Sequence, residues 1–464
     1  MSPTATTDED GPDIARRAAA YAVSFDPDDA PQAICDRAAL VLLDTVGVSL
    51  RGSTTPHVVD AAGALARLWG GTQADGATTF ATADRRSPAV AAYLNAAGGT
   101  TLELDEGNQR SAHPGIHTVP PALAVAESVG ASGDALFGAL VAGYEVGARL
   151  GDVIRPMRDG LHPHGGWAPV SGTVAAGRLL GLDERAMTAA IRMAVTPFVV
   201  GHWDAALTGA TVRDVYTGAC CHHGITAAGL ADAGLTGVEG AIEGCLLPYT
   251  AARPVTPALL APFETLGERY YLADSYVKQH AACRYAHAPL DALDRIRQRT
   301  TVDPADVERI AVETFELGLR LDSTRPENVL AAKFSTPYAL AASLVTGGSG
   351  VDAFTEALVA DDRVRSLAER VDVVADEAFE ARSADGEWGA RLTIDLADGT
   401  TLTETVRDAR GGGDSPFTRE EVLAKFDRLA GDVLPDRDVD RLRDRLLDVR
   451  SVADVSTLLA PVLA

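Results

Sequence analysis

Alanine and glycine dominate the apolar segments of this chain, and this property narrows the folds that it can adopt. Aromatic residues account for only 5% of the 464 positions, so few large side chains are available to fill a wide core. Helices that present small residues can approach one another closely, because the side chains at the contact set the distance between the helix axes. The sequence therefore predicts a mainly α-helical protein with a large all-helical domain.

Helical periodicity marks most of the first 234 residues. Ser132 and Asp183 precede two of these segments, which run to Leu150 and to about Ala194, and both residue types are preferred N-caps. The other predicted helices are Ile14 to Val23, Pro31 to Val48, Pro88 to Gly98 with Ser87 as the N-cap, Pro120 to Val129, Ser171 to Leu180, and residues 211 to 234.

Alternation typical of β-strands first appears after residue 274. Val307 to Phe315 is predicted to form one strand. Ala390 to Leu396 and Thr400 to Val406 are predicted to pair as a hairpin around Asp398-Gly399, a dipeptide that suits a type I′ turn. The sequence thus predicts a smaller α+β lid domain inserted into the helical one.

A glycine-rich joint at residues 411–413 ends the predicted insertion. Thr418 and Glu421 then form a capping box that starts a helix through Ala430. The predicted organisation is an acidic disordered tail at residues 1–12, a helical main domain at 13–274, the α+β lid domain at 275–411, and C-terminal helices at 412–464 that return to the helical domain.

Charge excludes two classes of partner. The formal net charge is −24, and only three of the 41 basic residues are lysines, namely Lys278, Lys333 and Lys425. Such a surface repels nucleic acid and anionic membranes, so neither is expected as a partner. The acidic, lysine-poor composition fits a halophilic cytoplasm of molar salt, although a GC-rich genome alone also favours arginine over lysine.

Cysteine usage and apolar runs bear on the compartment. Five cysteines, an odd number without a C-x-x-C pair, indicate reduced thiols inside a cell. The first residues lack the basic and apolar regions of a secretory signal, and the most apolar run, Ala135 to Val146, is short and interrupted by glycine. A cytoplasmic protein without a membrane span is therefore predicted.

The stretch from Glu103 to His117 places three carboxylates, an arginine and two histidines between two alanine-rich segments. Gly107, Pro114 and Gly115 are expected to break any helix through it. The stretch is therefore predicted to be a loop between rigid elements, where functional residues often lie. A solvated acidic turn with a capping histidine is the structural alternative.

Metal and nucleotide sites are not predicted. His113 and His117 have the spacing of a zinc-binding helix, but the proline and glycine between them argue against that helix. Cys220 and His223 are the remaining pair that could share an ion on a helix. No Walker A sequence, no dinucleotide fingerprint after a strand and no serine nucleophile elbow occurs, so neither a nucleotide site nor a serine nucleophile is predicted.

A set of basic and acid–base residues remains on the predicted loops. Arginine and lysine can clamp carboxylates, and histidine can move protons near neutral pH, so the set indicates a site for a small anion. Helix-capping roles for His162 and His287 and a surface position for Lys333 are the structural alternatives. The set consists of His113, His162, His164, Arg213, Lys278, Arg284, His287 and Lys333.

Seven pieces of the chain carry a family resemblance: Leu42-Leu-Asp-Thr-Val-Gly-Val48, Glu103-Leu-Asp-Glu with His113-Pro-Gly, Ala139 to Arg149 with its Gly-Tyr-Glu, His162-Pro-His-Gly, Gly181-Leu-Asp, Lys278 with Cys283-Arg-Tyr-Ala-His287, and Lys333-Phe-Ser-Thr-Pro-Tyr338. In this order and spacing they resemble the MmgE/PrpD superfamily over about residues 35 to 430. That superfamily includes 2-methylcitrate dehydratase, cis-aconitate decarboxylase and iminodisuccinate epimerase.

The resemblance implies a homodimeric enzyme without metal or cofactor, whose active site lies between the helical domain and the lid. It places the family's active-site loop on Glu103, Asp105 and His113, its second histidine on His162, its lysine on Lys278 and its lid tyrosine on Tyr338, with Arg284 and His287 facing the cleft. The predicted catalytic residues are His113, His162, Lys278, Asp105 and Tyr338, and the predicted substrate-binding residues are Glu103, Arg213, Arg284, His287, His164 and Lys333.

Two departures from the family pattern bear on the substrate. Residues 103–108, Glu-Leu-Asp-Glu-Gly-Asn, stand where dehydratase and decarboxylase members have an Asp-x-Asn/Asp-Asp-Thr-Trp-like run, and Arg213 stands where the decarboxylase has a lysine. Both differences alter the carboxylate clamp. The sequence therefore leaves the substrate open.

The predicted function is a cofactor-independent lyase of the dehydratase type that acts on a small di- or tricarboxylate such as 2-methylcitrate. The enzyme would remove a proton α to a carboxylate, with the enediolate stabilised by cations such as Lys278, Arg284 and Arg213. His113 or His162 would be the base, and the other histidine, or Tyr338, the acid. Decarboxylation, epimerisation by reprotonation on the opposite face, and a non-catalytic carboxylate-binding relative are the alternatives.

Overall fold

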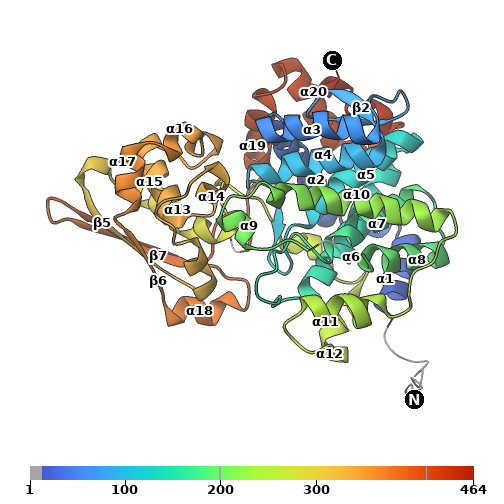
Figure 1. The fold of residues 1–464 in the computed structure, drawn as a ribbon, viewed down its shortest axis with the longest axis horizontal. Helices are drawn as coiled ribbons and strands as arrows, with labels where there is room; N and C mark the ends of the chain where they lie inside the picture. The colour runs from blue at the N-terminus through green and yellow to red at the C-terminus, as the bar shows by residue number, and fades with distance from the viewer. Residues whose placement is uncertain (1–12, 198–199, 414, 464) are drawn as a thin grey trace.

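The computed structural model describes residues 13–197, 200–413 and 415–463, and these residues are mainly α-helical (Figure 1). The predicted tail at residues 1–12 lies outside the described residues. The helices are α1 (Ile14–Ser24), α2 (Gln32–Gly52), α3 (Pro56–Trp69), α4 (Pro88–Thr101), α5 (Pro114–Val129), α6 (Gly133–Val153), α7 (Ala168–Leu179), α8 (Glu184–Val195), α9 (Asp204–Leu207), α10 (Val212–Asp232), α11 (Leu247–Thr250), α12 (Pro257–Leu260), α13 (His287–Arg299), α14 (Val329–Lys333), α15 (Thr336–Thr346), α16 (Glu356–Val359), α17 (Asp362–Ala368), α18 (Glu377–Ser383), α19 (Arg419–Gly431) and α20 (Asp436–Leu447). The strands are β1 (Ala77–Thr79), β2 (Asp84–Arg86), β3 (Gly107–Asn108), β4 (Ser275–Tyr276), β5 (Val307–Thr314), β6 (Val371–Ala375), β7 (Ala390–Leu396) and β8 (Thr401–Val406).

The predicted helix caps are mostly confirmed. The side chain of Ser132 accepts the Ala135 N–H at the start of α6, and that of Asp183 accepts an N–H at the start of α8. Thr418 makes both bonds of the predicted capping box at the start of α19. Ser87 stands at the N-cap position of α4, but its side chain makes no capping bond.

The predicted loop is present from Glu103 to His113, but helix α5 begins at Pro114, so the prediction that the loop extends to His117 was wrong. Proline suits the first helical position, because the N–H that it lacks has no partner there and its fixed φ is helical. The loop therefore ends at His113, which is the N-cap residue, and His117 lies in the first turn of α5.

Small residues allow the central helices to approach closely, as the composition predicted. Helix α7 packs against α5, α6 and α10. A Cβ added at Gly143 of α6 would lie 2.7 Å from the carbonyl oxygen of Ser171 in α7. A Cβ at Gly224 of α10 would lie equally close to the Pro169 carbonyl. These contacts leave no room for larger side chains, so the helical body is held together by backbone proximity.

A four-stranded sheet with the order β6-β5-β7-β8 forms the centre of a smaller unit, at the left of Figure 1. Strands β5 and β6 are parallel and the other two pairings are antiparallel. Helix α13 packs against β7 and β8. The predicted hairpin is present, but only Gly399 in its turn has a positive φ. A type I′ turn needs positive φ at both central residues, so that turn assignment was wrong.

The C-terminal helices lie beside the first helices of the chain. Helix α19 packs against α2, and α20 packs against both, which Figure 1 shows as red ribbon beside blue. In the described part of the chain, no helix combines the length and the apolar character needed to cross a bilayer.

Candidate active site

A short β-bridge brings two distant charged residues together. Strands β3 and β4 pair antiparallel, with Gly107 opposite Tyr276. Extending this register by two residues places Asp105 opposite Lys278, and alternate residues of a strand share a face. The Lys278 ammonium accordingly lies 3.4 Å from the Asp105 carboxylate, and both side chains are fully buried. The Tyr276 ring covers Gly107 so closely that no larger residue would fit there.

Glu103 bridges two cations at the end of α4. One carboxylate oxygen accepts from Lys278 Nζ at 3.1 Å, and the other pairs with the Arg213 guanidinium of α10. Glu103 also has a φ of +54°, in the left-handed region that side chains other than glycine rarely adopt. Such a conformation costs about 1–2 kcal/mol, and residues held in it cluster at functional sites.

All three lysines of the chain are buried and contact the segment from residue 101 to residue 105. Lys333 donates to the Thr101 carbonyl at 2.6 Å, and its burial lowers its pKa to about 8. Lys425 of α19 donates to the Leu104 carbonyl at 2.8 Å and pairs with Asp44 of α2 at 2.7 Å. With Lys278, they anchor the loop from three separate elements.

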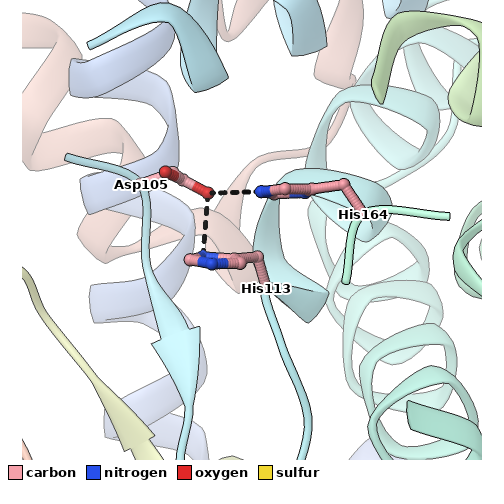
Figure 2. Close-up of side chains that lie close together, drawn as sticks. All are labelled: Asp105, His113 and His164. Carbon is pink, nitrogen blue, oxygen red and sulfur yellow. Dashed lines mark ion pairs between the residues drawn. The ribbon is translucent and has the colours of Figure 1, made fainter. Parts of the chain in front are cut away.

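Asp105 and His113 form an ion-pair contact at the centre of the site (Figure 2). His113 Nδ1 lies 3.0 Å from Asp105 Oδ2 and 2.8 Å from the Glu106 carbonyl oxygen. Both partners are acceptors, so in the neutral form of His113 the proton is on Nδ1 and the lone pair of Nε2 is available. Burial alone would raise the pKa of Asp105, but the attraction of His113 and Lys278 holds it below its ordinary value. The His113 side chain keeps 14% exposure and Asp105 has none, so His113 is the reachable member.

His164 stacks on His113 with ring centroids 4.4 Å apart. Its Nε2 lies 3.4 Å from an Arg213 nitrogen and 4.0 Å from Asp105 Oδ2, and its Nδ1 lies 3.1 Å from Nε2 of His117. Because arginine can only donate, His164 Nε2 accepts and Nδ1 donates to His117. Burial lowers the pKa of His164 well below its ordinary value. His164 is therefore neutral near pH 7.

His162 also stacks on His164, at 5.2 Å between ring centroids. Its Nδ1 accepts the His164 backbone N–H at 3.2 Å, so its proton is on Nε2. Burial and the neighbouring His113 lower the pKa of His162 to about 3. In this neutral form His162 is a poor base and a hydrogen-bond donor.

Two residues of this cluster were absent from the predicted site, Glu106 and His117. Glu106 is fully buried and holds the loop to α5 and α6: it accepts the Gly115 N–H at 2.8 Å and the Tyr144 hydroxyl at 2.5 Å. Burial raises its pKa to about 7, although both hydrogen bonds favour the ionised form. Both residues lie in the polar stretch that the sequence singled out, and the helix start at Pro114 is the signal that would have directed His117 inward.

Asp105, His113 and His164 could in principle hold a metal ion, because one ligand atom from each lies within 4.8 Å of the others. The hydrogen bonds oppose that use in this arrangement. His113 Nδ1 carries a proton toward Glu106, the His164 lone pair faces Arg213, and the Lys278 ammonium sits against the same carboxylate. A cation would have to displace all three interactions, so the donor set fits proton transfer near an anion better than metal binding.

The structure brings seven of the predicted site residues together: Glu103, Asp105, His113, His162, His164, Arg213 and Lys278. Lys333 lies at the edge of this group, on the Thr101 carbonyl. The remaining three contact the smaller unit instead: Arg284 donates to the carbonyls of Ala409 and Arg410, His287 contacts the Ala282 carbonyl, and Tyr338 donates to the Ala353 carbonyl.

Comparison with known families agrees with this architecture. Residues 16–250 match the MmgE/PrpD N-terminal domain, and residues 280–449 match the MmgE/PrpD C-terminal domain. The chain therefore belongs to the MmgE/PrpD family, as the sequence resemblance predicted.

Several relatives are similar over nearly the whole chain. A cis-aconitate decarboxylase-like protein of Aspergillus oryzae is 27% identical over 468 residues, covering 95% of both chains. The cis-aconitate decarboxylase of Aspergillus terreus is 25% identical, covering 95% of this chain and 94% of its own. The human cis-aconitate decarboxylase is 24% identical, covering 92% and 89%.

Proposed function

We propose that this protein is a cofactor-independent lyase that removes a proton α to a carboxylate of a small di- or tricarboxylate. The observation that carries the proposal is the contact of buried Asp105 with partly exposed His113, beside two cations, Lys278 and Arg213. A positioned base next to fixed positive charge is what α-proton removal requires, because the developing enediolate is anionic.

His113 is the proposed base. With Nδ1–H directed at Asp105 and the Glu106 carbonyl, Nε2 can take the α-proton of a bound substrate. Asp105 orients the ring and stabilises the imidazolium that forms, without being protonated itself. Lys278 and Arg213 stabilise the negative charge that moves onto the substrate carboxylate.

Dehydration then requires the β carbon–oxygen bond to break. The electron pair left by the α-proton forms the alkene, and the hydroxyl leaves as water after receiving a proton. The His162 Nε2–H, or the imidazolium of His113, is the proposed donor. Tyr338 is bound within the smaller unit in this arrangement, so it would have to leave the Ala353 carbonyl to act as the acid.

Decarboxylation is the second candidate, and the relatives favour it. Proteins named cis-aconitate decarboxylase are 24–25% identical to this chain. In that reaction the same cations would stabilise the carbanion left when carbon dioxide departs, and a histidine would return a proton to carbon. Arg213 binds carboxylates through the planar guanidinium, whereas a lysine would present a mobile ammonium. This difference affects which substrate carboxylate is bound.

The candidate site is mostly buried, so a substrate needs a route into it. Leu102 and Leu104, which flank Glu103, pack within the hydrophobic cluster of the smaller unit. We therefore propose that the smaller unit acts as a lid that moves from the helical body to admit substrate. A homodimer in the cytoplasm remains part of the proposed function, on the basis of the family resemblance.

The test is a substrate panel followed by proton NMR in deuterium oxide. Citrate, 2-methylcitrate, aconitate and the hydroxyaspartate stereoisomers are incubated with the protein, with His113→Ala as the control. An alkene product supports the dehydratase, and loss of carbon dioxide supports the decarboxylase. Solvent exchange at one carbon without net change would identify an epimerase. If no member of the panel reacts or exchanges, the catalytic proposal fails.

A further inference from the structure

The carboxylate of Glu103 pairs with the two cations that lie beside the histidine cluster. Glu103 lies between Lys278 and Arg213 and is 2% exposed. We propose that Glu103 is a built-in competitor at the substrate carboxylate subsite, so that a substrate carboxylate takes its place between Lys278 and Arg213. This inference rests on the proposed function in one respect, namely that the ligand is a carboxylate.

Both cations stay anchored when Glu103 is removed. Arg213 donates through NH1 to the Thr100 carbonyl at 2.8 Å and pairs with Asp214 at 3.3 Å. Lys278 keeps its contact with Asp105 at 3.4 Å. The Arg213 NH2 group and one N–H of Lys278 therefore remain directed at the position that the Glu103 carboxylate occupies. This is a preformed site for a single carboxylate group, and among the described residues the carboxylate that fills it is that of Glu103.

Charge balance points the same way. Among the described residues in contact at the site, Lys278 has Asp105 as a second partner and Arg213 has Asp214. Without Glu103, each buried cation is still paired with one anion, and an incoming carboxylate replaces the charge that Glu103 supplied. Displacement therefore leaves no buried cation unpaired.

The backbone conformation of Glu103 favours its movement away from the two cations. Glu103 has a φ of +54°, so its present placement is strained, and any movement of the loop that returns φ to negative values relieves that strain. The neighbouring carbonyls of Thr101 and Leu104 are held by Lys333 and Lys425. These anchors confine the movement to Glu103 and its immediate neighbours.

The experiment measures the binding of malonate, a small dicarboxylate that needs no turnover. Isothermal titration calorimetry at fixed potassium chloride is applied to the wild-type protein and to Glu103→Gln, Glu103→Asp and Glu106→Gln. Glu103→Gln removes the competing charge while keeping the shape. Glu103→Asp keeps the charge but withdraws it by about 1.5 Å, one carbon–carbon bond. Glu106→Gln, compared at pH 8 where Glu106 is ionised, removes a buried charge from the same loop that touches neither cation.

The expected result is a malonate Kd about tenfold or more lower in Glu103→Gln than in the wild type, because a charge-assisted competitor has been lost. Glu103→Asp should move the Kd in the same direction, and Glu106→Gln should leave it unchanged. If Glu103→Gln does not fold, Glu103→Asp decides. Unchanged or weaker binding in the Glu103 variants, or an equal gain in Glu106→Gln, overturns the proposal.

The inference and the proposed function fail separately. If the protein turns over a carboxylate but the Glu103 variants bind malonate no more tightly than the wild type, Glu103 is not a competitor and the lyase proposal stands. A malonate gain in a protein that turns over no carboxylate would keep the subsite and remove the lyase.

Discussion

Replacing Glu106 by glutamine should stabilise the protein above neutral pH and change little below pH 5. Burial raises the pKa of Glu106 from 4.5 to about 7. Between these two values the folded state holds a proton that the unfolded state has released, so the stability of the wild type falls as pH rises. Over about 2.5 pH units, at 1.36 kcal/mol per unit, the loss approaches about 3 kcal/mol and then stays constant above pH 7.

Glutamine should remove this loss, because it resembles the protonated acid. In both forms one oxygen can accept the Gly115 N–H while the other position directs a donor toward Tyr144. At pH 5 the two proteins are therefore expected to be equally stable. At pH 8 the variant should be more stable, by up to about 3 kcal/mol.

Chemical denaturation of both proteins from pH 5 to pH 9, at fixed high salt, measures the difference in free energy of unfolding. Glu308→Gln, at an exposed position of β5, controls for the loss of a surface carboxylate. A difference between Glu106→Gln and wild type that does not change with pH would refute the reasoning, because Glu106 would then titrate alike in the folded and unfolded chains.

The remaining predictions concern activity and salt. His113→Ala should lower kcat by about 10² to 10⁴ with a modest change in KM, and near-full kcat in this variant would refute His113 as the base. Lys278→Ala should lower kcat and raise KM, whereas Lys278→Arg should keep part of the substrate binding, because the positive charge is retained although the guanidinium differs in shape from the ammonium. Steady-state kinetics on the identified substrate measures both constants. Prolonged chelation should leave the rate unchanged, and activity that is lost and then restored by zinc or iron would contradict this. The melting temperature should rise from dilute to molar potassium chloride, where the screening length falls to about 3 Å, and a flat response would refute the prediction.

Elements whose signals are local could be predicted from the amino-acid sequence. The N-caps Ser132 and Asp183, the capping box at Thr418 and the alternation of residues 390–396 each act within a few residues, so they appear in the structure where they were predicted. The small-residue composition likewise determined how closely the helices pack. Strand β6 was missed, because only Val371 of its five residues is buried and its pairing with β5 is not local.

The contacts within the candidate site depend on the three-dimensional packing of the chain. The sequence singled out the polar stretch at residues 103–117 and the residues Arg213 and Lys278, but it could not give their partners. The β3–β4 register set Lys278 opposite Asp105, and the start of α5 at Pro114 fixed the positions of His113 and His117. The same packing left Tyr338 and His287 on carbonyls of the smaller unit. These contacts join residues that lie far apart in the chain. Which elements meet depends on how the whole chain packs, and no local sequence pattern contains that information.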